Sequence, residues 1–118
     1  MKVLRREYGC PVEFAVDCLG GKWKTVILSH LKNGPKRYAD LRRSVRPLSD
    51  KMLNERLLEL LGAGLIEKRA IDGSYSISAR GQTLAPVLQA LYDWGQASAE
   101  AMNVRFRTDD IEVSSAAE

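Results

Sequence analysis

The spacing of apolar residues predicts two helices in the first third of the chain. In the first, which begins at Pro11 and ends before Gly20, apolar residues recur at i, i+3, i+4 and i+7 and form one inward face: Val12, Ala15, Val16 and Leu19. Proline suits the first turn because its missing N–H would have no helical partner there. A second helix runs from about Lys22 to the Asn-Gly-Pro at 33–35, with these inward residues: Trp23, Val26, Ile27 and Leu31.

Two further helices follow. A short one over Tyr38 to Ser44 turns Leu41 inward and its arginines outward. Ser49 is predicted to cap a fourth helix, because its hydroxyl can accept a hydrogen bond from the backbone N–H of Lys51 or Met52. The buried stripe of that helix consists of leucines: Leu53, Leu57, Leu60 and Leu61.

A β-hairpin and a long helix are predicted next. Two short β-like runs, Ile66 to Ile71 and Tyr75 to Ser78, flank Asp72-Gly73, a dipeptide that favours a two-residue type I′ turn. The last helix runs from about Arg80 to Met102, and Pro86 should kink or tighten its first turns. The acidic, Ser/Ala-rich stretch beyond residue 107 is predicted to be a disordered tail.

This order of elements predicts a mostly α fold with a small β-hairpin, a winged helix-turn-helix. In such a fold the third helix crosses the phosphate backbone of DNA, the fourth places its first turn in the major groove, and the hairpin reaches alongside. At 118 residues and 45% hydrophobic, the chain suits one domain. We expect an N-terminal arm over 1–9, the winged domain over 10–106 with a dimerisation helix over about 80–102, and the acidic tail over 107–118.

Positive charge is concentrated on the elements that would face DNA. The net charge is +3, but the last eleven residues carry four carboxylates and no Lys or Arg, which leaves +7 on residues 1–107. Between residues 32 and 56 there are eight cations and three carboxylates, a net charge of +5. A basic stripe of this kind favours binding to a polyanion, although a solvated helix face is the commoner cause of a charge run.

The composition favours a cytoplasmic protein without a metal or a cofactor. No apolar run is long enough to span a membrane, and the N-terminus lacks the apolar core of a signal peptide. One histidine and two cysteines are too few soft ligands for a four-ligand zinc site. That histidine, His30, has no acid or nucleophile at a fixed spacing and is expected to be partly buried. We therefore predict that the protein is not an enzyme.

Four segments resemble the successive signature segments of HxlR-type transcriptional regulators, winged-helix proteins related to the MarR group: CPVEFAVDCLGGKW, NGPKRYADLRRSV, LSDKMLNERLLELLGAGLIEK and YSISARGQTLAPVLQALYDWG. The likeness runs from about Cys10 to Trp94. It implies a bacterial or archaeal homodimer that binds an operator and regulates nearby genes, in several members through the cysteine before the proline. Two features depart from the family pattern. The hairpin loop is shorter, which leaves the minor-groove contact of the wing open, and Asp50 and Lys51 stand where the family tends to have Gln and Arg.

The predicted DNA contacts lie on the third and fourth helices and just before them. Lys51, on the exposed side of the first turn of the fourth helix, is expected to donate to guanine O6 and N7. Arginines of the basic block, Arg37 among them, are assigned to phosphates, where they set the register without reading sequence. The full predicted set is Lys36, Arg37, Arg42, Arg43, Ser49, Asp50, Lys51, Met52, Asn54, Glu55 and Arg56.

Three residues of this set have two interpretations each. Asp50 either stabilises the N-terminus of its helix or accepts a hydrogen bond from a cytosine amino group. Asn54 either pairs with an adenine or has a structural role at the edge of the core. Arg56 lies closer to the buried side, and it binds either Glu59 or a phosphate.

The last helix belongs either to the core or to an interface with a second copy. Its length, on a chain with a small core, favours the interface, with these contact residues: Leu88, Leu91, Tyr92, Trp94 and Gly95. Twofold symmetry then predicts a near-palindromic site whose half-sites lie about one helical turn, or a multiple of it, apart. The expected partners are double-stranded DNA and a second copy, not a membrane. The alternative is a dimeric ligand-binding or protein-interaction module that uses the same fold without reading DNA.

The two cysteines, Cys10 and Cys18, are predicted to differ in role. Eight residues on a helix span about 12 Å, too far for a disulfide within the intact first helix. Cys18 flanks the apolar face and is expected to be a small buried residue. Cys10 precedes Pro11 at the N-cap, where free N–H groups and the helix dipole favour a thiolate. It is therefore either an oxidisable sensor, responsive to an oxidant or small molecule, or only a helix cap.

Overall fold

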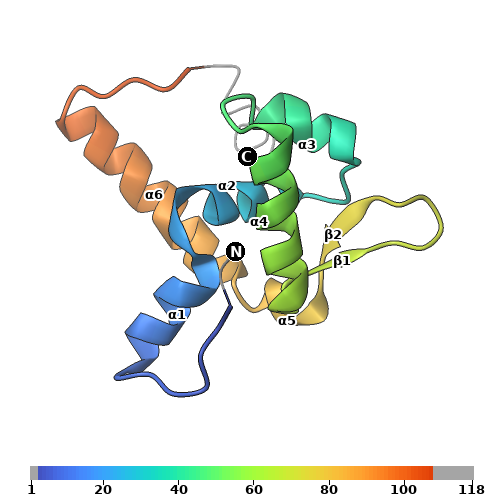
Figure 1. Cartoon of the computed structure of the whole chain (residues 1–118). Coiled ribbons are helices and arrows are strands. Elements are labelled where there is room, and N and C mark those ends of the chain that lie inside the picture. Colours follow the sequence, from blue (N-terminus) through green and yellow to red (C-terminus); the bar gives the residue numbers. More distant parts are fainter. Residues whose placement is uncertain (1–2, 108–118) are drawn as a thin grey trace.

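The computed structural model describes residues 3–107 (Figure 1). Most of the predicted acidic tail, residues 108–118, lies outside this range. The elements in chain order are α1 (Pro11–Leu19), α2 (Gly21–Leu31), α3 (Tyr38–Ser44), α4 (Asp50–Gly62), β1 (Ile66–Lys68), β2 (Tyr75–Ile77), α5 (Ala79–Gln82) and α6 (Ala85–Ala101). The mostly helical fold with one small hairpin, predicted from the sequence, is confirmed.

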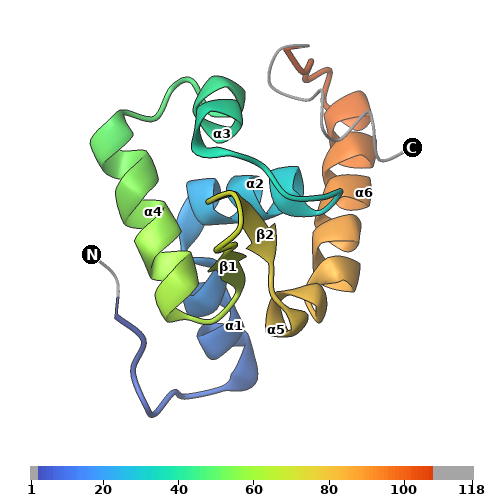
Figure 2. The same ribbon diagram turned by 90° about the vertical axis from the view of Figure 1, so that its right-hand side faces the viewer.

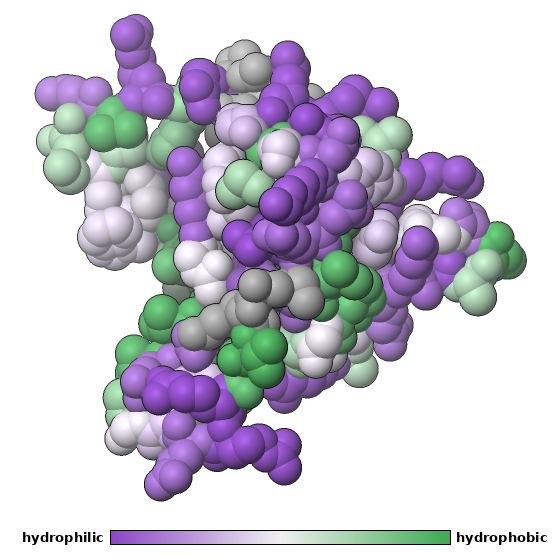
Figure 3. Space-filling model, viewed as in Figure 1, coloured by the Kyte–Doolittle hydropathy of each residue, from purple (hydrophilic) through white to green (hydrophobic). Residues whose placement is uncertain are grey.

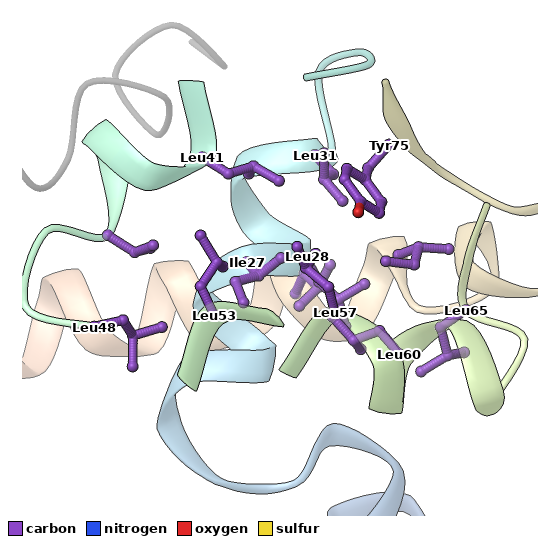
Figure 4. Close-up of a cluster of buried hydrophobic side chains, with 13 residues drawn as sticks. Ile27, Leu28, Leu31, Leu41, Leu48, Leu53, Leu57, Leu60, Leu65 and Tyr75 are labelled. Carbon is purple, nitrogen blue, oxygen red and sulfur yellow. The ribbon is translucent and has the colours of Figure 1, made fainter. Parts of the chain in front are cut away.

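A single apolar cluster joins α2, α3, α4 and the hairpin (Figure 4). The helical spacing identified most of it correctly: Ile27, Leu31, Leu41, Leu53, Leu57 and Leu60 are fully buried. Trp23, Val26 and Leu61 pack against its edge and are only partly buried. His30, expected to be partly buried, is 4% exposed and therefore lies inside. The helices α4 and α6 flank α2 on opposite sides (Figure 2), so α2 is the central element.

The hairpin forms the wing. The strands β1 and β2 pair antiparallel with Ile66 opposite Ile77, and the segment before α3 adds a bridge in which Lys36 and Tyr75 exchange backbone hydrogen bonds of 2.9 and 2.8 Å. The predicted two-residue turn is wrong. The N–H of Arg69 donates to the carbonyl of Ser74 at 2.7 Å, so the loop comprises the four residues 70–73.

The physical reason for the longer loop is a side chain. The Asp72 carboxylate accepts hydrogen bonds from the backbone N–H of Ser74 at 3.0 Å and from its hydroxyl at 2.7 Å. An aspartate that bonds its own backbone two residues on forms a turn of its own, which competes with the type I′ turn. Gly73 still has a positive φ of 72°, as predicted for a turn glycine.

The predicted continuous helix from Arg80 to Met102 is also wrong, because it is two helices. The break falls between α5 and α6, at Thr83 and Leu84. Pro86 occupies the first turn of α6, where its missing N–H is tolerated, whereas in the interior of a longer helix it would remove a hydrogen bond and clash with the preceding turn. The expected kink is therefore a full break.

The first helix does not turn its apolar face inward. Val12 is 70% exposed and Val16 is also exposed, because α1 packs mainly against α2 and extends from the body of the protein (Figure 1). Only its C-terminal end reaches the interior, where Cys18 is buried as predicted. The periodicity identified the residues that share a face, but the face is left uncovered within one chain.

Candidate nucleic-acid interface

The N-terminus of α4 is built to present side chains. The Ser49 hydroxyl accepts a hydrogen bond of 3.1 Å from the N–H of Met52, which confirms the predicted cap. Beyond it, Lys51, Met52 and Asn54 are exposed on the outer side, while the leucine stripe is buried on the opposite side. Hydrophilic side chains cover this part of the surface, over α3 and α4 (Figure 3).

A polar cluster fixes α4 to α3. The Asp50 carboxylate accepts hydrogen bonds from the Tyr38 hydroxyl at 2.8 Å and from Arg42 Nε at 2.9 Å. These two bonds, first that of Tyr38 and then that of Arg42, lower the pKa of Asp50. Asn54 extends the cluster, because its amide nitrogen lies 3.5 Å from the Tyr38 hydroxyl. The geometry thus favours the helix-stabilising interpretation of Asp50 and the structural one of Asn54.

The basic residues around this cluster differ in their exposure and in whether they form ion pairs. Arg37 and Arg43 are exposed, and Lys36 is half-buried. Arg43 forms an ion pair with Asp40 within α3. Arg42 forms an ion pair with Asp50, whereas Lys51 is exposed at the first turn of α4. The first turn of α4 thus carries one cation, Lys51, that is open to solvent.

Arg56, which is partly exposed, forms an ion pair with the buried Glu59. The Arg56 Nε lies 2.7 Å from a carboxylate oxygen of Glu59, and that oxygen lies 3.9 Å from the ammonium of Lys24. Glu55, also predicted to contact DNA, lies 3.5 Å from the Arg56 guanidinium. Lys24 is only 3% exposed, so a buried ionic cluster connects α2 to α4. Of the two interpretations of Arg56, the structure therefore supports the one in which it binds Glu59.

Sequence reasoning missed Lys24, although a signal was present. Lys24 precedes Ile27, Leu28 and Leu31 by three, four and seven residues, which places a lysine on the buried stripe of α2. A charge at such a position needs a buried partner. Glu59, next to the buried Leu60 on α4, is that partner.

The residues predicted for the dimer interface do not all lie on the surface. Leu88 is 3% exposed and belongs to the core, so it has almost no surface to offer a second copy. Leu91 and Trp94 are exposed, Trp94 by 73%, and Tyr92 and Gly95 are half-buried. Exposed apolar side chains also lie on α1: Val12 and Val16, which the pattern had assigned to the inward face, and Phe14, which it had not singled out.

Cys10 is exposed at the N-cap of α1. Glu13, in the first turn of α1, fixes the segment before Cys10. Its carboxylate accepts a hydrogen bond of 2.7 Å from the N–H of Gly9 and forms an ion pair of 3.0 Å with Arg5. The Gly9 bond and then the Arg5 bond lower the pKa of Glu13. Cys10 lines an open pocket of about 930 Å³ between the N-terminal arm, Phe14 of α1 and the C-terminal end of α4.

Other kinds of site find no support in residues 3–107. No group of three or more His, Cys, Asp or Glu side chains among them is arranged to hold a metal ion. None of the helices in this range is long and apolar enough to cross a membrane.

The arrangement of a capped helix, a short basic helix and a wing agrees with the comparison to known families. Residues 18–103 match the family model described as HxlR-like helix-turn-helix. The chain belongs to the HxlR family. YdeP, an HTH-type transcriptional regulator of Bacillus subtilis, is 35% identical over 115 residues, which cover 93% of this chain and 85% of YdeP.

Solved structures of related regulators have the same fold. The redox regulator HypR in its reduced form superposes with a TM-score of 0.72 at 30% identity, over 81% of this chain and all of that one. Quinone-bound YodB from B. subtilis superposes with a TM-score of 0.66 at 32% identity, over 75% of this chain and 99% of that one. The predicted family and the winged helix-turn-helix fold are confirmed, and the HxlR protein is a DNA-binding transcriptional regulator.

Proposed function

We propose that this HxlR protein acts in the cytoplasm as a homodimeric, redox-responsive regulator, not as an enzyme, and that it binds a near-palindromic operator through α4. The observation that carries the proposal is the first turn of α4. It is capped by Ser49, held against α3 by Asp50, and presents Lys51 to solvent. A helix fixed in this way can place one side chain on a base edge without a large loss of entropy on binding.

Lys51 reads a guanine, and the cations around it hold the phosphates. Because the Asp50 carboxylate already accepts hydrogen bonds from Tyr38 and Arg42, its role is to orient Lys51 and not to accept a hydrogen bond from a base. Arg37 and Lys36 lie just before α3, where the chain approaches the backbone of DNA in this fold. These contacts position the protein but carry no sequence information.

A mobility-shift titration with the DNA upstream of the protein's own gene tests this function. We expect Lys51→Ala to weaken binding by about tenfold or more, because a good base contact contributes about 1–3 kcal/mol. Lys22→Ala removes the same charge from the start of α2 and should leave the affinity nearly unchanged. Binding by the wild type should fall on the order of 10³-fold between about 50 and 200 mM salt if a dimer neutralises six or more phosphates. A flat salt titration would contradict DNA binding and favour the alternative, a ligand-binding or protein-interaction module.

The dimer is proposed from uncovered apolar side chains. They belong to α1 and α6, which lie on the side of the molecule away from the wing (Figure 1): Val12, Phe14, Val16, Val87, Leu91 and Trp94. Large apolar side chains that are exposed in number on neighbouring turns of a helix are typical of an interaction site. We expect the wild type to sediment as a dimer at micromolar concentration and Trp94→Glu as a monomer. Ile71→Glu, at a similarly exposed apolar residue on the wing, should leave the dimer intact.

The redox response is assigned to Cys10. It is exposed and lines a pocket, whereas Cys18 is buried. Solved relatives include the redox regulator HypR in an oxidised and a reduced form, and YodB with a bound quinone. Modification of Cys10, or a disulfide to a cysteine of the other copy, would act on α1 and through it on the dimer. An oxidant or an electrophilic small molecule is the proposed effector.

A further inference from the structure

The tip of the wing is apolar. Ile71 is 84% exposed and Ala70 beside it is exposed as well (Figure 3, far end of the wing). Most of the large apolar residues exposed on helices lie on α1 and α6, which the proposed dimer would cover, and two more, Met52 and Leu58, lie on α4. Ile71 lies on neither α1 nor α6, so a second copy packed on those faces does not account for it.

Hydrogen bonds between residues of the loop itself hold Ile71 in a defined position. The N–H of Gly73 donates to the Arg69 carbonyl at 2.8 Å, and the Asp72 carboxylate takes the backbone N–H and hydroxyl of Ser74. The Ser74 bonds, backbone first, lower the pKa of Asp72, so the carboxylate that closes the loop stays charged at neutral pH. A preorganised tip loses little entropy when it binds.

The base of the wing is fixed to the elements that approach DNA. Lys36 exchanges two backbone hydrogen bonds with Tyr75 of β2, at 2.9 and 2.8 Å, and the next residue, Arg37, is the N-cap of α3. The wing therefore keeps its position relative to α3 and, through Asp50, relative to α4. Any DNA placed by those helices meets the wing at a set distance along the groove.

The wing combines cationic flanks with its apolar tip. Arg69 and Arg37 both lie near enough to Asp72 to act on its carboxylate, and the Lys68 ammonium lies 5.6 Å from the centre of the Tyr75 ring. Cations beside a groove suit the phosphates on its two edges. An arginine at the tip would favour the negative potential of a narrow A-tract minor groove, whereas a branched apolar side chain packs on sugars and on partly unstacked base steps.

We propose that Ile71 is a specificity-determining residue that enters the minor groove next to each half-site and selects flexible pyrimidine–purine steps over A-tracts. This inference rests on the proposed DNA binding and adds a second point of sequence selection outside the major groove. The selection comes from the energy of deforming the DNA, not from hydrogen bonds to bases.

The test uses the duplex that the wild-type protein enriches from a random-sequence library. Its flank under the wing is then rebuilt with either a TA step or an A-tract, and both duplexes are titrated with wild type, Ile71→Ser and the control Val104→Ser, which alters an exposed apolar residue beyond α6. We expect the wild type and the control to prefer the TA duplex by about tenfold, which is within the usual effect of one altered base pair. Ile71→Ser should lose that preference and the hydroxyl-radical protection of the flanking minor groove, with an unchanged salt slope.

Two variants separate shape from charge at the tip. Ile71→Leu should keep the preference for the TA duplex, and Arg69→Gln should keep it too but reduce the salt slope by about one. An Ile71→Ser protein that retains both the preference and the protection would overturn the inference while the proposed function stands. A wild-type protein that enriches no duplex would instead overturn the proposed function and this inference together.

Discussion

The Asp50 carboxylate at the start of α4 accepts a hydrogen bond of 2.8 Å from the Tyr38 hydroxyl at the start of α3. The bond joins the two helices that must contact DNA together, and it depends on one surface carboxylate that Arg42 also contacts. Burial, and then the hydrogen bond to Asp50, raise the pKa of Tyr38, so its hydroxyl remains a donor throughout the neutral range. The geometry of the helix-turn-helix thus rests on a polar contact at its outer edge as well as on the leucines beneath it.

Asp50→Asn should destabilise the protein at neutral pH and much less in acid. Because the pKa of Asp50 is lowered on folding, its contribution is present above the ordinary pKa of an aspartate and is lost as the pH falls through the lowered value. Thermal unfolding at about pH 7 should show a lower melting temperature for the variant, and the difference should shrink as the pH falls below the ordinary pKa of an aspartate. Glu67→Gln, on the exposed side of β1, is the matched control. A difference that is the same at both pH values would contradict the role of the charge.

Glu59→Gln should be far more damaging than its conservative chemistry suggests. The Lys24 and Glu59 side chains are 4% and 3% exposed, so removal of the carboxylate takes away the negative charge that lies 3.9 Å from the buried Lys24 ammonium. We expect a loss of about 3 kcal/mol or more in the free energy of unfolding, measured in urea. Lys24→Met leaves Glu59 paired with Arg56 and should cost less than about 2 kcal/mol. Equal losses in the free energy of unfolding for the two variants would show that charge pairing does not determine the stability of the buried cluster.

Gly81→Ala and Gly62→Ala should have opposite effects. A Cβ at Gly81 of α5 would lie 2.1 Å from the Leu65 carbonyl oxygen and 2.7 Å from a methyl group of Ile77. The helix and the wing would have to separate, at a cost of about 1–3 kcal/mol. A Cβ at Gly62 of α4 meets nothing within 4 Å, so alanine there should stabilise by about 0.5–1 kcal/mol through its better helix propensity. Chemical denaturation of both variants measures the two effects.

Cys10→Ser should abolish the response of DNA binding to oxidants. The thiol is exposed at the N-cap of α1, and serine is a good N-cap, so the fold should be retained. Binding to the upstream DNA is titrated with and without diamide, and only the wild type and Cys18→Ala should respond. A diamide response retained in Cys10→Ser would show that Cys10 is only a helix cap. Cys18→Ala is a fair control because its sulfur is buried.

The sequence predicted α4 well because leucine spacing and a serine cap are local signals. Ser49, Leu53 and Leu57 lie where the pattern placed them. The wing loop was mispredicted because the Asp72 side chain bonds Ser74, a choice that the Asp-Gly dipeptide does not reveal. The buried Lys24 was overlooked because its partner lies on another helix.

Periodicity has a more general limit, which α1 shows. It identifies side chains that share a face, but not whether that face meets the same chain or another. Val12 and Val16 have the spacing of core residues and are exposed. Within the proposed site, the charged residues of α3 and α4 could be grouped from the sequence, but their division into intramolecular pairs and free donors required the structure.

The uncovered face of α1 also has a consequence for how the activity of the protein depends on its own concentration. A fold whose first helix is completed by a second copy gains stability by mass action, so its melting temperature should rise with protein concentration. If only the dimer binds the operator, promoter occupancy at low copy number should increase with about the square of the number of chains. The exposed valines of a nine-residue helix would then set how sharply transcription responds to a change in synthesis of the regulator.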